Sequence, residues 1–254
     1  FTGNKFEFRM PGASQSIADP NIVLNTIMAE SLSQFADKLE KKSEDIESAS
    51  RRLIKETFKK HRRILFNGNG YAPEWVAEAE VRGLCNYRTT ADAVPHLTDS
   101  KNVSLFARHH VYTEAELISR REIMFSDYVK ITHIEASTML DMARKEIIPA
   151  SISYMKEISE TVVNFQNIGI DSTFKKSLLG KISENTDSLS KELDNLAESV
   201  EKLDSIKEVS AQANFVRDSV IPTMNKVRLY ADNLETLVAK KYWPFPTYGE
   251  MLFV

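Results

Sequence analysis

The amino-acid sequence predicts a mostly α-helical protein: long antiparallel helices that include a coiled-coil-like hairpin, preceded by one short β-strand. Only 8 glycines and 8 prolines occur among 254 residues, and they cluster, so the long stretches that lack both predict long helices. In the last third of the chain, apolar residues recur at steps of four and three, the spacing of a coiled-coil seam. Residues 5–9 instead alternate charged and aromatic side chains, which is the period of a strand.

The composition excludes several classes of protein. Hydrophobic residues make up 42% and charged residues 27%, which is ordinary for a soluble protein, and no apolar run approaches the length of a bilayer span. The net charge of −3 and the pI near 6.0 do not favour nucleic-acid binding. Cys85 is the single cysteine, so neither a disulfide framework nor a thiolate metal cluster is expected. The sequence therefore predicts a cytoplasmic protein that binds neither nucleic acid nor membrane.

The predicted strand places Lys5, Glu7 and Arg9 on one face and Phe6 and Phe8 on the other. This pattern fits a surface hairpin, and it also fits a buried strand that presents an acid and two bases to a ligand. Such a strand needs neighbours in a sheet, which the rest of the chain does not supply, and the chain starts without Met. We therefore expect it to be the carboxy-terminal piece of a larger protein.

The next segment predicts one helix from Asn21 to about Arg63, with Asp19 as its cap and Pro20 in its first turn. Its apolar residues share one seam, and its end is strongly basic. The seam residues are Phe35, Leu39, Ile46 and Leu53, and the basic residues are Arg51, Arg52, Lys55, Lys59, Lys60, Arg62 and Arg63. Cations suit the negative end of a helix dipole, so a solvated helix end explains this cluster. Contact with nucleotide phosphate or with another subunit is the alternative.

Turn signals divide the middle of the chain. Residues 67–70 (NGNG) predict a turn, and the short helix after it, which begins at Pro73, stops at Gly83. Short helices and connections follow over residues 84–112. The sequence TEAE at 113–116 is a capping box that opens a long helix to about Asn167, with a kink at Pro149.

Two heptad-patterned helices come next, joined by a few polar residues, and they predict an antiparallel hairpin. The first is capped by Asp171 and carries Leu189, Leu193, Leu196, Val200 and Leu203. The second spans about 207–241 and carries Val209, Ala213, Val216, Val220, Met224, Val227, Ala231, Leu234 and Val238. Its one step of four followed by four lies beside Pro222, which predicts a stutter or kink there. The aromatic, proline-rich tail at 242–254 should dock either on a neighbouring subunit or back on its own helices.

Several stretches together resemble the carboxy-terminal part of type III glutamine synthetases. They are FTGNKFEFRMPG at 1–12, PNIVLNT at 20–26, FNG at 66–68 with Gly70 and Tyr71, Glu135-Ala136 with Met139 and Asp141-Met142-Ala143, and KYWPFPTYG at 241–249. The resemblance implies that residues 1–24 are the last strand and loop of the catalytic α/β domain. It further implies a helical region at 25–170, a helical hairpin at 171–241 and a tail at 242–254.

The resemblance also implies an activity. Enzymes of this family join glutamate and ammonia with ATP through γ-glutamyl phosphate, use Mg²⁺ or Mn²⁺, and form large ring-shaped homo-oligomers, here expected to be dodecamers. The active site is shared between subunits and needs further carboxylates, so the 254-residue chain alone is expected to be inactive. The alternative is a non-enzymatic helical scaffold or oligomerisation domain. The strand at 5–9 argues against this alternative, because a purely helical scaffold has no sheet that a charged strand could join.

The site residues follow from the same resemblance. Glu7 matches a metal-binding glutamate, Arg9 an arginine that contacts substrate glutamate or the transferring phosphoryl group, and Lys5 a basic residue that contacts nucleotide. A carboxylate on a rigid strand suits Mg²⁺, and the arginine fork suits carboxylate or phosphate. An ion pair between Glu7 and Arg9 is the structural alternative. Many relatives continue into Pro-Asp-Pro, whereas Met10, Pro11 and Gly12 follow here, so the contacts of this loop stay open.

The histidines have no partners at metal-ligand spacing. His109 and His110 are adjacent and point in different directions on a helix, and His133 is isolated. We therefore predict that all three are surface or packing residues.

Overall fold

A computed structural model describes residues 16–41, 45–246 and 248–252. Within these ranges the chain is helical and contains no strand, which confirms the mostly α-helical class. The predicted strand at 5–9 lies outside the described residues. The chain divides into two compact units, a first unit of residues 1–88 and 92–121 and a second unit of residues 89–91 and 122–254.

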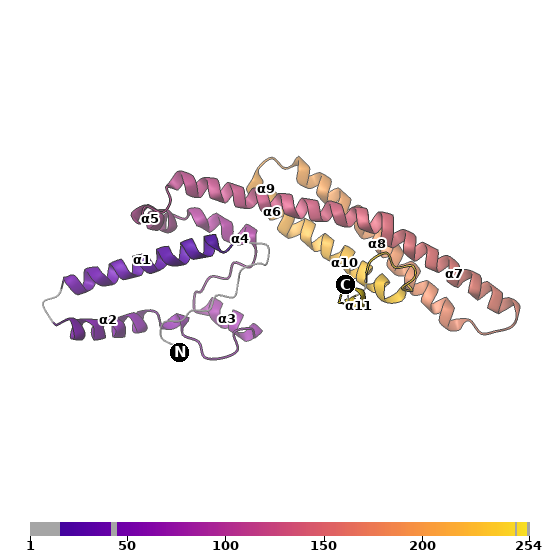
Figure 1. Cartoon of the computed structure of the whole chain (residues 1–254), viewed down its shortest axis with the longest axis horizontal. Coiled ribbons are helices and arrows are strands. Elements are labelled where there is room, and N and C mark those ends of the chain that lie inside the picture. The colour runs from indigo at the N-terminus through magenta and orange to yellow at the C-terminus, as the bar shows by residue number, and fades with distance from the viewer. Residues whose placement is uncertain (1–15, 42–44, 247, 253–254) are drawn as a thin grey trace. The chain divides into compact units, whose positions relative to one another are not determined.

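The first unit opens with two helices where the sequence predicts one. α1 spans Ala18–Glu40 and α2 spans Ile46–Lys60, and the two pack against each other (Figure 1). The prediction of a single helix over 21–63 was therefore wrong. Asp45 is the physical reason, because its carboxylate accepts hydrogen bonds from the backbone N–H groups of Glu47 and Ser48, both at 3.0 Å, and so starts a new helix.

The predicted seam is consequently a contact across the α1–α2 pair. Phe35 and Leu39 of α1 and Leu53 of α2 line the same apolar groove, whereas Ile46 is 66% exposed and takes no part in it. α1 begins at Ala18, whose N–H is bound by the Ser16 hydroxyl at 3.1 Å. Asp19 thus lies in the first turn and is not the cap residue.

Short helices follow α2 along the chain, and all of this stretch except residues 89–91 belongs to the first unit. They are a 3₁₀ turn at Arg62–Ile64, α3 at Pro73–Val81, α4 at Thr90–Ala93, a 3₁₀ turn at Val94–Thr98 and α5 at Ser100–Arg108. The turn predicted at 67–70 lies two residues later, over 69–72, where the Asn69 carbonyl accepts from the Ala72 N–H at 3.2 Å and the Asn69 side chain from the Tyr71 N–H at 3.0 Å. Gly83 ends α3 in the left-handed region with φ 68°, which a residue without Cβ adopts at little cost.

α6 at Glu114–Met142 and α7 at Ile148–Asn167 form the predicted long helix. The capping box is present: the Glu116 carboxylate accepts from the Thr113 N–H at 2.7 Å, and the Thr113 hydroxyl accepts from the Glu116 N–H at 3.3 Å. Between the two helices lies a π-helical turn at Ala143–Ile147. Pro149 explains this π-helical turn. In a regular α-helix its ring would clash with the carbonyl four residues earlier, and the wider turn leaves room for the ring and that carbonyl.

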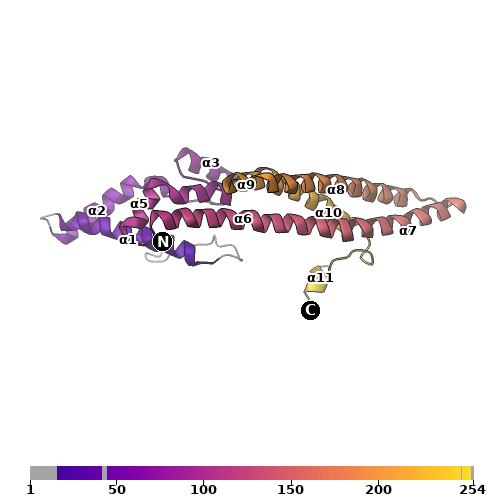
Figure 2. The same ribbon diagram turned by 90° about the horizontal axis from the view of Figure 1, so that it is seen from above.

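α8 at Thr173–Ser205 and α10 at Ile221–Leu237 pack against each other in the second unit. α8 runs alongside both α7 and α10 (Figures 1 and 2). Seam residues at most 1% exposed are Leu189, Leu193, Leu196, Leu203, Ala213, Val216, Val220, Val227 and Leu234. The Asp171 carboxylate accepts from the Thr173 N–H at 3.1 Å, but the cap residue of α8 is Ser172, so the prediction of Asp171 as the cap was wrong by one residue.

The stutter beside Pro222 is a second π-helical turn. It spans Val216–Val220 and joins the short α9 at Val209–Phe215 to α10. Each π turn is followed by isoleucine and proline, so one local rule explains the deformation at both places. The last helix is α11 at Tyr248–Met251. None of the described helices combines the length and apolar character that crossing a membrane requires.

Candidate functional site

The predicted site residues Lys5, Glu7 and Arg9 lie outside the described residues, so their roles stay predictions. The structure describes the helices that follow them. In the ranges 16–41, 45–246 and 248–252, no group of three or more His, Cys, Asp and Glu side chains could hold a metal ion.

Contacts with α5 and α6 position α1, the first described helix after the predicted strand. Asp19 in its first turn lies 3.9 Å from the guanidinium of Arg120 on α6, and Arg120 also covers the ring of Tyr112 at 4.2 Å. These exposed contacts orient the start of α1 but add little stability in water.

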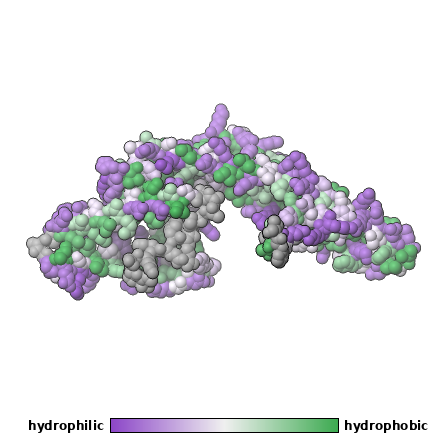
Figure 3. All heavy atoms as spheres, in the orientation of Figure 1, coloured by the Kyte–Doolittle hydropathy of each residue, from purple (hydrophilic) through white to green (hydrophobic). Residues whose placement is uncertain are grey.

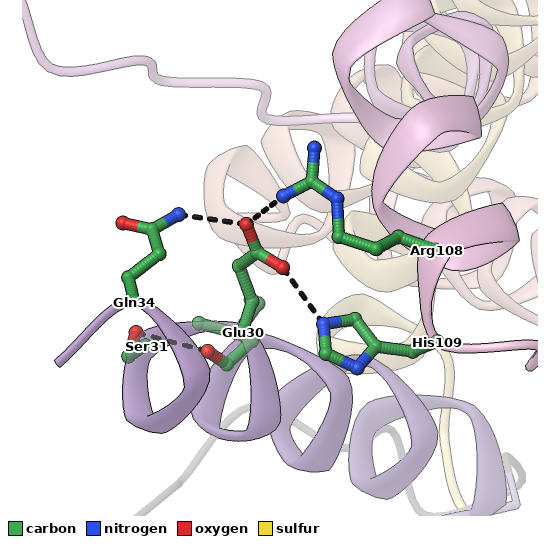
Figure 4. A network of polar contacts seen from close by, with 6 residues as sticks. Glu30, Ser31, Gln34, Arg108 and His109 are labelled. Atoms are coloured by element: carbon green, nitrogen blue, oxygen red, sulfur yellow. Dashed lines mark hydrogen bonds and ion pairs between the residues drawn. The ribbon is translucent and has the colours of Figure 1, made fainter. Parts of the chain in front are cut away.

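The stronger anchor of α1 is the carboxylate of Glu30, which is 13% exposed. Gln34 donates to its Oε1 at 2.7 Å, Nε2 of His109 lies 2.7 Å from its Oε2, and Arg108 forms an ion pair with it (Figure 4). Arg108 and His109 stand at the end of α5, so this cluster joins α5 to the middle of α1. The hydrogen bond from Gln34, then that with His109 and the adjacent positive charges, hold the pKa of Glu30 below its usual 4.5.

The lowered pKa of Glu30 predicts an acid-sensitive contact. A carboxyl whose pKa is lower in the folded than in the unfolded state stabilises the fold above its unfolded pKa, and this contribution disappears as the pH falls through the folded value. We expect hydrogen exchange of α1 amides in the full-length protein, corrected for intrinsic rates, to accelerate below about pH 4.5. Glu30→Gln should remove this acid dependence, whereas Glu40→Gln at the exposed end of α1 should keep it. An unchanged acid response in Glu30→Gln would refute the assignment.

His109 and His133 pair with carboxylates, which their sequence spacing did not reveal. His109 contacts Glu30 as described, and His133 Nε2 lies 3.2 Å from the Asp204 carboxylate. His110 adopts φ 53° after the end of α5. The pairing of His109 with Glu30 joins residues far apart in the chain, and no local motif could have indicated it.

The start of the tail contacts α7 through Tyr242 and the preceding Lys241, which supports docking on the chain's own helices at this point. Lys241 Nζ lies 2.5 Å from the Glu157 carboxylate, and the Tyr242 hydroxyl donates to the same carboxylate. The rings of Tyr242 and Tyr154 lie 5.4 Å apart. Bonds from Lys241 and Tyr242 lower the pKa of Glu157, and the contact with Glu157 raises the pKa of both partners.

Comparison with known proteins shows which proteins this chain is similar to. The family described as glutamine synthetase C-terminal domain matches residues 49–166, a range from α2 to the end of α7. A protein named type-3 glutamine synthetase from Dictyostelium discoideum is 36% identical over 262 residues, which covers 100% of this chain and 36% of that protein.

Two further relatives have the same coverage of 100% of this chain and 36% of their own length. They are named glutamine synthetase, from Butyrivibrio fibrisolvens at 34% identity over 264 residues and from Bacteroides fragilis at 29% over 262 residues. The chain thus spans about a third of the length of these curated relatives. It belongs to the glutamine synthetase family, as a carboxy-terminal part of the type 3 members.

Proposed function

We propose that the full-length protein that carries this chain is an ATP-dependent glutamate–ammonia ligase, which makes glutamine through γ-glutamyl phosphate. The observation that carries the proposal is the 36% identity, over all of this chain, to a protein named type-3 glutamine synthetase. The matched family over residues 49–166 supports it independently of residues 1–15.

Within this proposal, Lys5, Glu7 and Arg9 contribute three different kinds of contact. The Glu7 carboxylate supplies a hard oxygen donor. The Arg9 guanidinium supplies a rigid pair of N–H donors for substrate carboxylate or the transferring phosphoryl group, and the Lys5 ammonium a mobile positive charge for nucleotide phosphate. Mg²⁺ or Mn²⁺, when bound, would neutralise charge on the phosphate oxygens. The chain's own residues position the reactants, which is most of what phosphoryl transfer requires.

The finer architecture belongs to the same proposal. Residues 1–24 would end the catalytic domain with the strand at 5–9, residues 25–170 would form the helical region, 171–241 a coiled-coil hairpin and 242–254 the tail. We also propose that the protein is cytoplasmic and binds neither nucleic acid nor membranes.

Self-association into a ring-shaped homo-oligomer, with a dodecamer as the expected form, is the part of the proposal that concerns partners. Exposed apolar side chains on the α1–α2 pair support it. Leu32, Ile54 and Phe58 are 61%, 56% and 58% exposed, and hydrophobic side chains gather on this part of the molecule in the view of Figure 3. Apolar clusters of this kind favour burial against another protein surface.

The proposal is tested by comparing the full-length protein with the 254-residue chain in a glutamine-forming assay with glutamate, ammonia, ATP and Mg²⁺. We expect the full-length protein to be active. The 254-residue chain should be inactive, because Glu7 is its single predicted metal carboxylate. A folded full-length protein without activity would favour the scaffold alternative, and glutamine formation by the short chain would refute the shared-site assignment.

A further inference from the structure

Three arginines from two separate segments surround one open cavity in the first unit. The cavity measures about 600 Å³ and is lined by Arg62, Arg63, Leu65, Asn67 and Arg82. Arg62 and Arg63 belong to the 3₁₀ turn after α2, whereas Arg82 is the cap residue of α3. The fold therefore brings together cations that are well separated in the chain.

Arg82 is held rigidly in the wall of this cavity. Its Nη1 donates to the carbonyl oxygens of Leu65 at 2.8 Å and Arg63 at 3.2 Å, and its Nη2 pairs with the Glu78 carboxylate. Its guanidinium also lies 5.2 Å from the centre of the Trp75 ring. Because Arg82 fixes the backbone of the segment that carries Arg63 and Leu65, the cavity is preorganised.

The charge at the cavity exceeds what the surrounding acids compensate. Glu78 forms an ion pair with Arg82. Neither Arg62 nor Arg63 forms an ion pair with a carboxylate within the described ranges. Arg63 makes one long contact, from Nη1 to the Gly83 carbonyl at 3.4 Å. Lys59 and Lys60 in the last turn of α2 add further positive charge to this end of the helix.

The helix dipole does not account for this arrangement. Cations in the last turn of a helix are stabilised by about 0.3–1 kcal/mol, and this effect fades beyond that turn. It explains Lys59 and Lys60, which lie inside α2. Arg62 and Arg63 follow the end of the helix, and Arg82 comes from a different helix, so their convergence needs another explanation.

We propose that this basic cavity binds an oligophosphate, either inorganic or the phosphate chain of a nucleotide. Guanidinium groups match phosphate oxygens in paired hydrogen bonds, and the Asn67 amide adds a neutral donor. The volume lies within the range of about 300–1,000 Å³ that small-molecule sites occupy. Several cations without carboxylate partners fit a ligand with several negative charges better than a single monovalent anion.

The test measures protection of backbone amides from hydrogen exchange in the full-length protein. Because this protection is local, it distinguishes phosphate binding at this cavity from phosphate binding elsewhere on the protein. Pyrophosphate should slow hydrogen exchange of backbone amides in residues 61–67 and 82–84. In Arg62→Gln/Arg63→Gln, the pyrophosphate concentration for half-maximal protection should rise at least ~10-fold, as expected when charge-assisted bonds to phosphate are lost. Lys156→Gln/Lys181→Gln removes the same charge from exposed lysines of the second unit and should leave this concentration unchanged.

A parallel titration with ADP distinguishes the two sources of the ligand. Protection by pyrophosphate alone supports an inorganic oligophosphate, and tighter protection by ADP supports a nucleotide. No protection of residues 61–67 by either compound would overturn the proposal. It would also be overturned if the double variant kept its pyrophosphate response but lost oligomeric mass, because the arginines would then belong to a subunit contact.

Discussion

Replacing Glu7 with glutamine in the full-length protein is expected to lower the rate of ATP-dependent glutamine formation by about 10²–10³-fold, the usual effect of removing one preorganised electrostatic contact. Glutamine keeps the shape of the side chain but removes the negative charge that a divalent cation requires. The measurement is kcat at saturating glutamate, ammonia and ATP, repeated at rising Mg²⁺ concentration. Partial recovery at high Mg²⁺ would identify the loss as one of metal affinity.

Glu235→Gln on the exposed face of α10 is the matched control and should leave kcat unchanged. Arg9→Lys separates two roles of the neighbouring arginine, because it keeps the charge but loses the fork geometry. If Glu7→Gln retained full activity at low Mg²⁺, Glu7 would not be a metal ligand. The ion pair between Glu7 and Arg9 would then be the better account of the strand.

The second unit could be predicted from the sequence because its core follows from local periodicity. Leu189, Leu193 and Leu196 repeat at steps of four and three and are all at most 1% exposed. Pro149 and Pro222 marked the two deformed turns, since a proline disturbs the helix in its own vicinity whatever packs around it. Signals of this kind need no knowledge of distant residues.

The first unit was predicted less well because its organisation depends on contacts between distant residues. Helical periodicity continues from Phe35 through Ile46, so the break between α1 and α2 is marked mainly by Asp45. A single capping residue is a weak signal for a helix break when the apolar periodicity continues across it. The cluster at Glu30 joins residues nearly eighty positions apart, and the basic cavity joins Arg62 to Arg82. Neither arrangement has a local signature.

The candidate catalytic residues were accessible only through the resemblance to a family. Lys5, Glu7 and Arg9 form a pattern that is common in ordinary strands, and the pattern alone does not identify a site. The physical reason is that a shared active site is assembled from several segments, each of which contributes one or two side chains. One segment alone specifies the type of donor but not the site.

The largest expected effect on stability concerns Leu196, which is fully buried at 0% exposure in the seam of α8. Leu196→Ala should destabilise the second unit by about 2–5 kcal/mol, because the lost side chain leaves a cavity in addition to lost apolar burial. Native-state hydrogen exchange of α8 and α10 in the full-length protein measures this locally. Amides that exchange through opening of this pair should exchange roughly 30-fold to 4,000-fold faster, at about 1.4 kcal/mol per factor of ten.

Leu229→Ala is the matched control, since Leu229 lies on the neighbouring α10 but is 55% exposed and its removal leaves no cavity. If both variants accelerated exchange equally, the effect would reflect loss of leucine from a helix and not packing in the seam. If Leu196→Ala had no effect, α8 would not depend on this seam at all. An effect on α8 and α10 without change in α1 and α2 would further indicate that the two units open independently, as expected when each has its own apolar contacts.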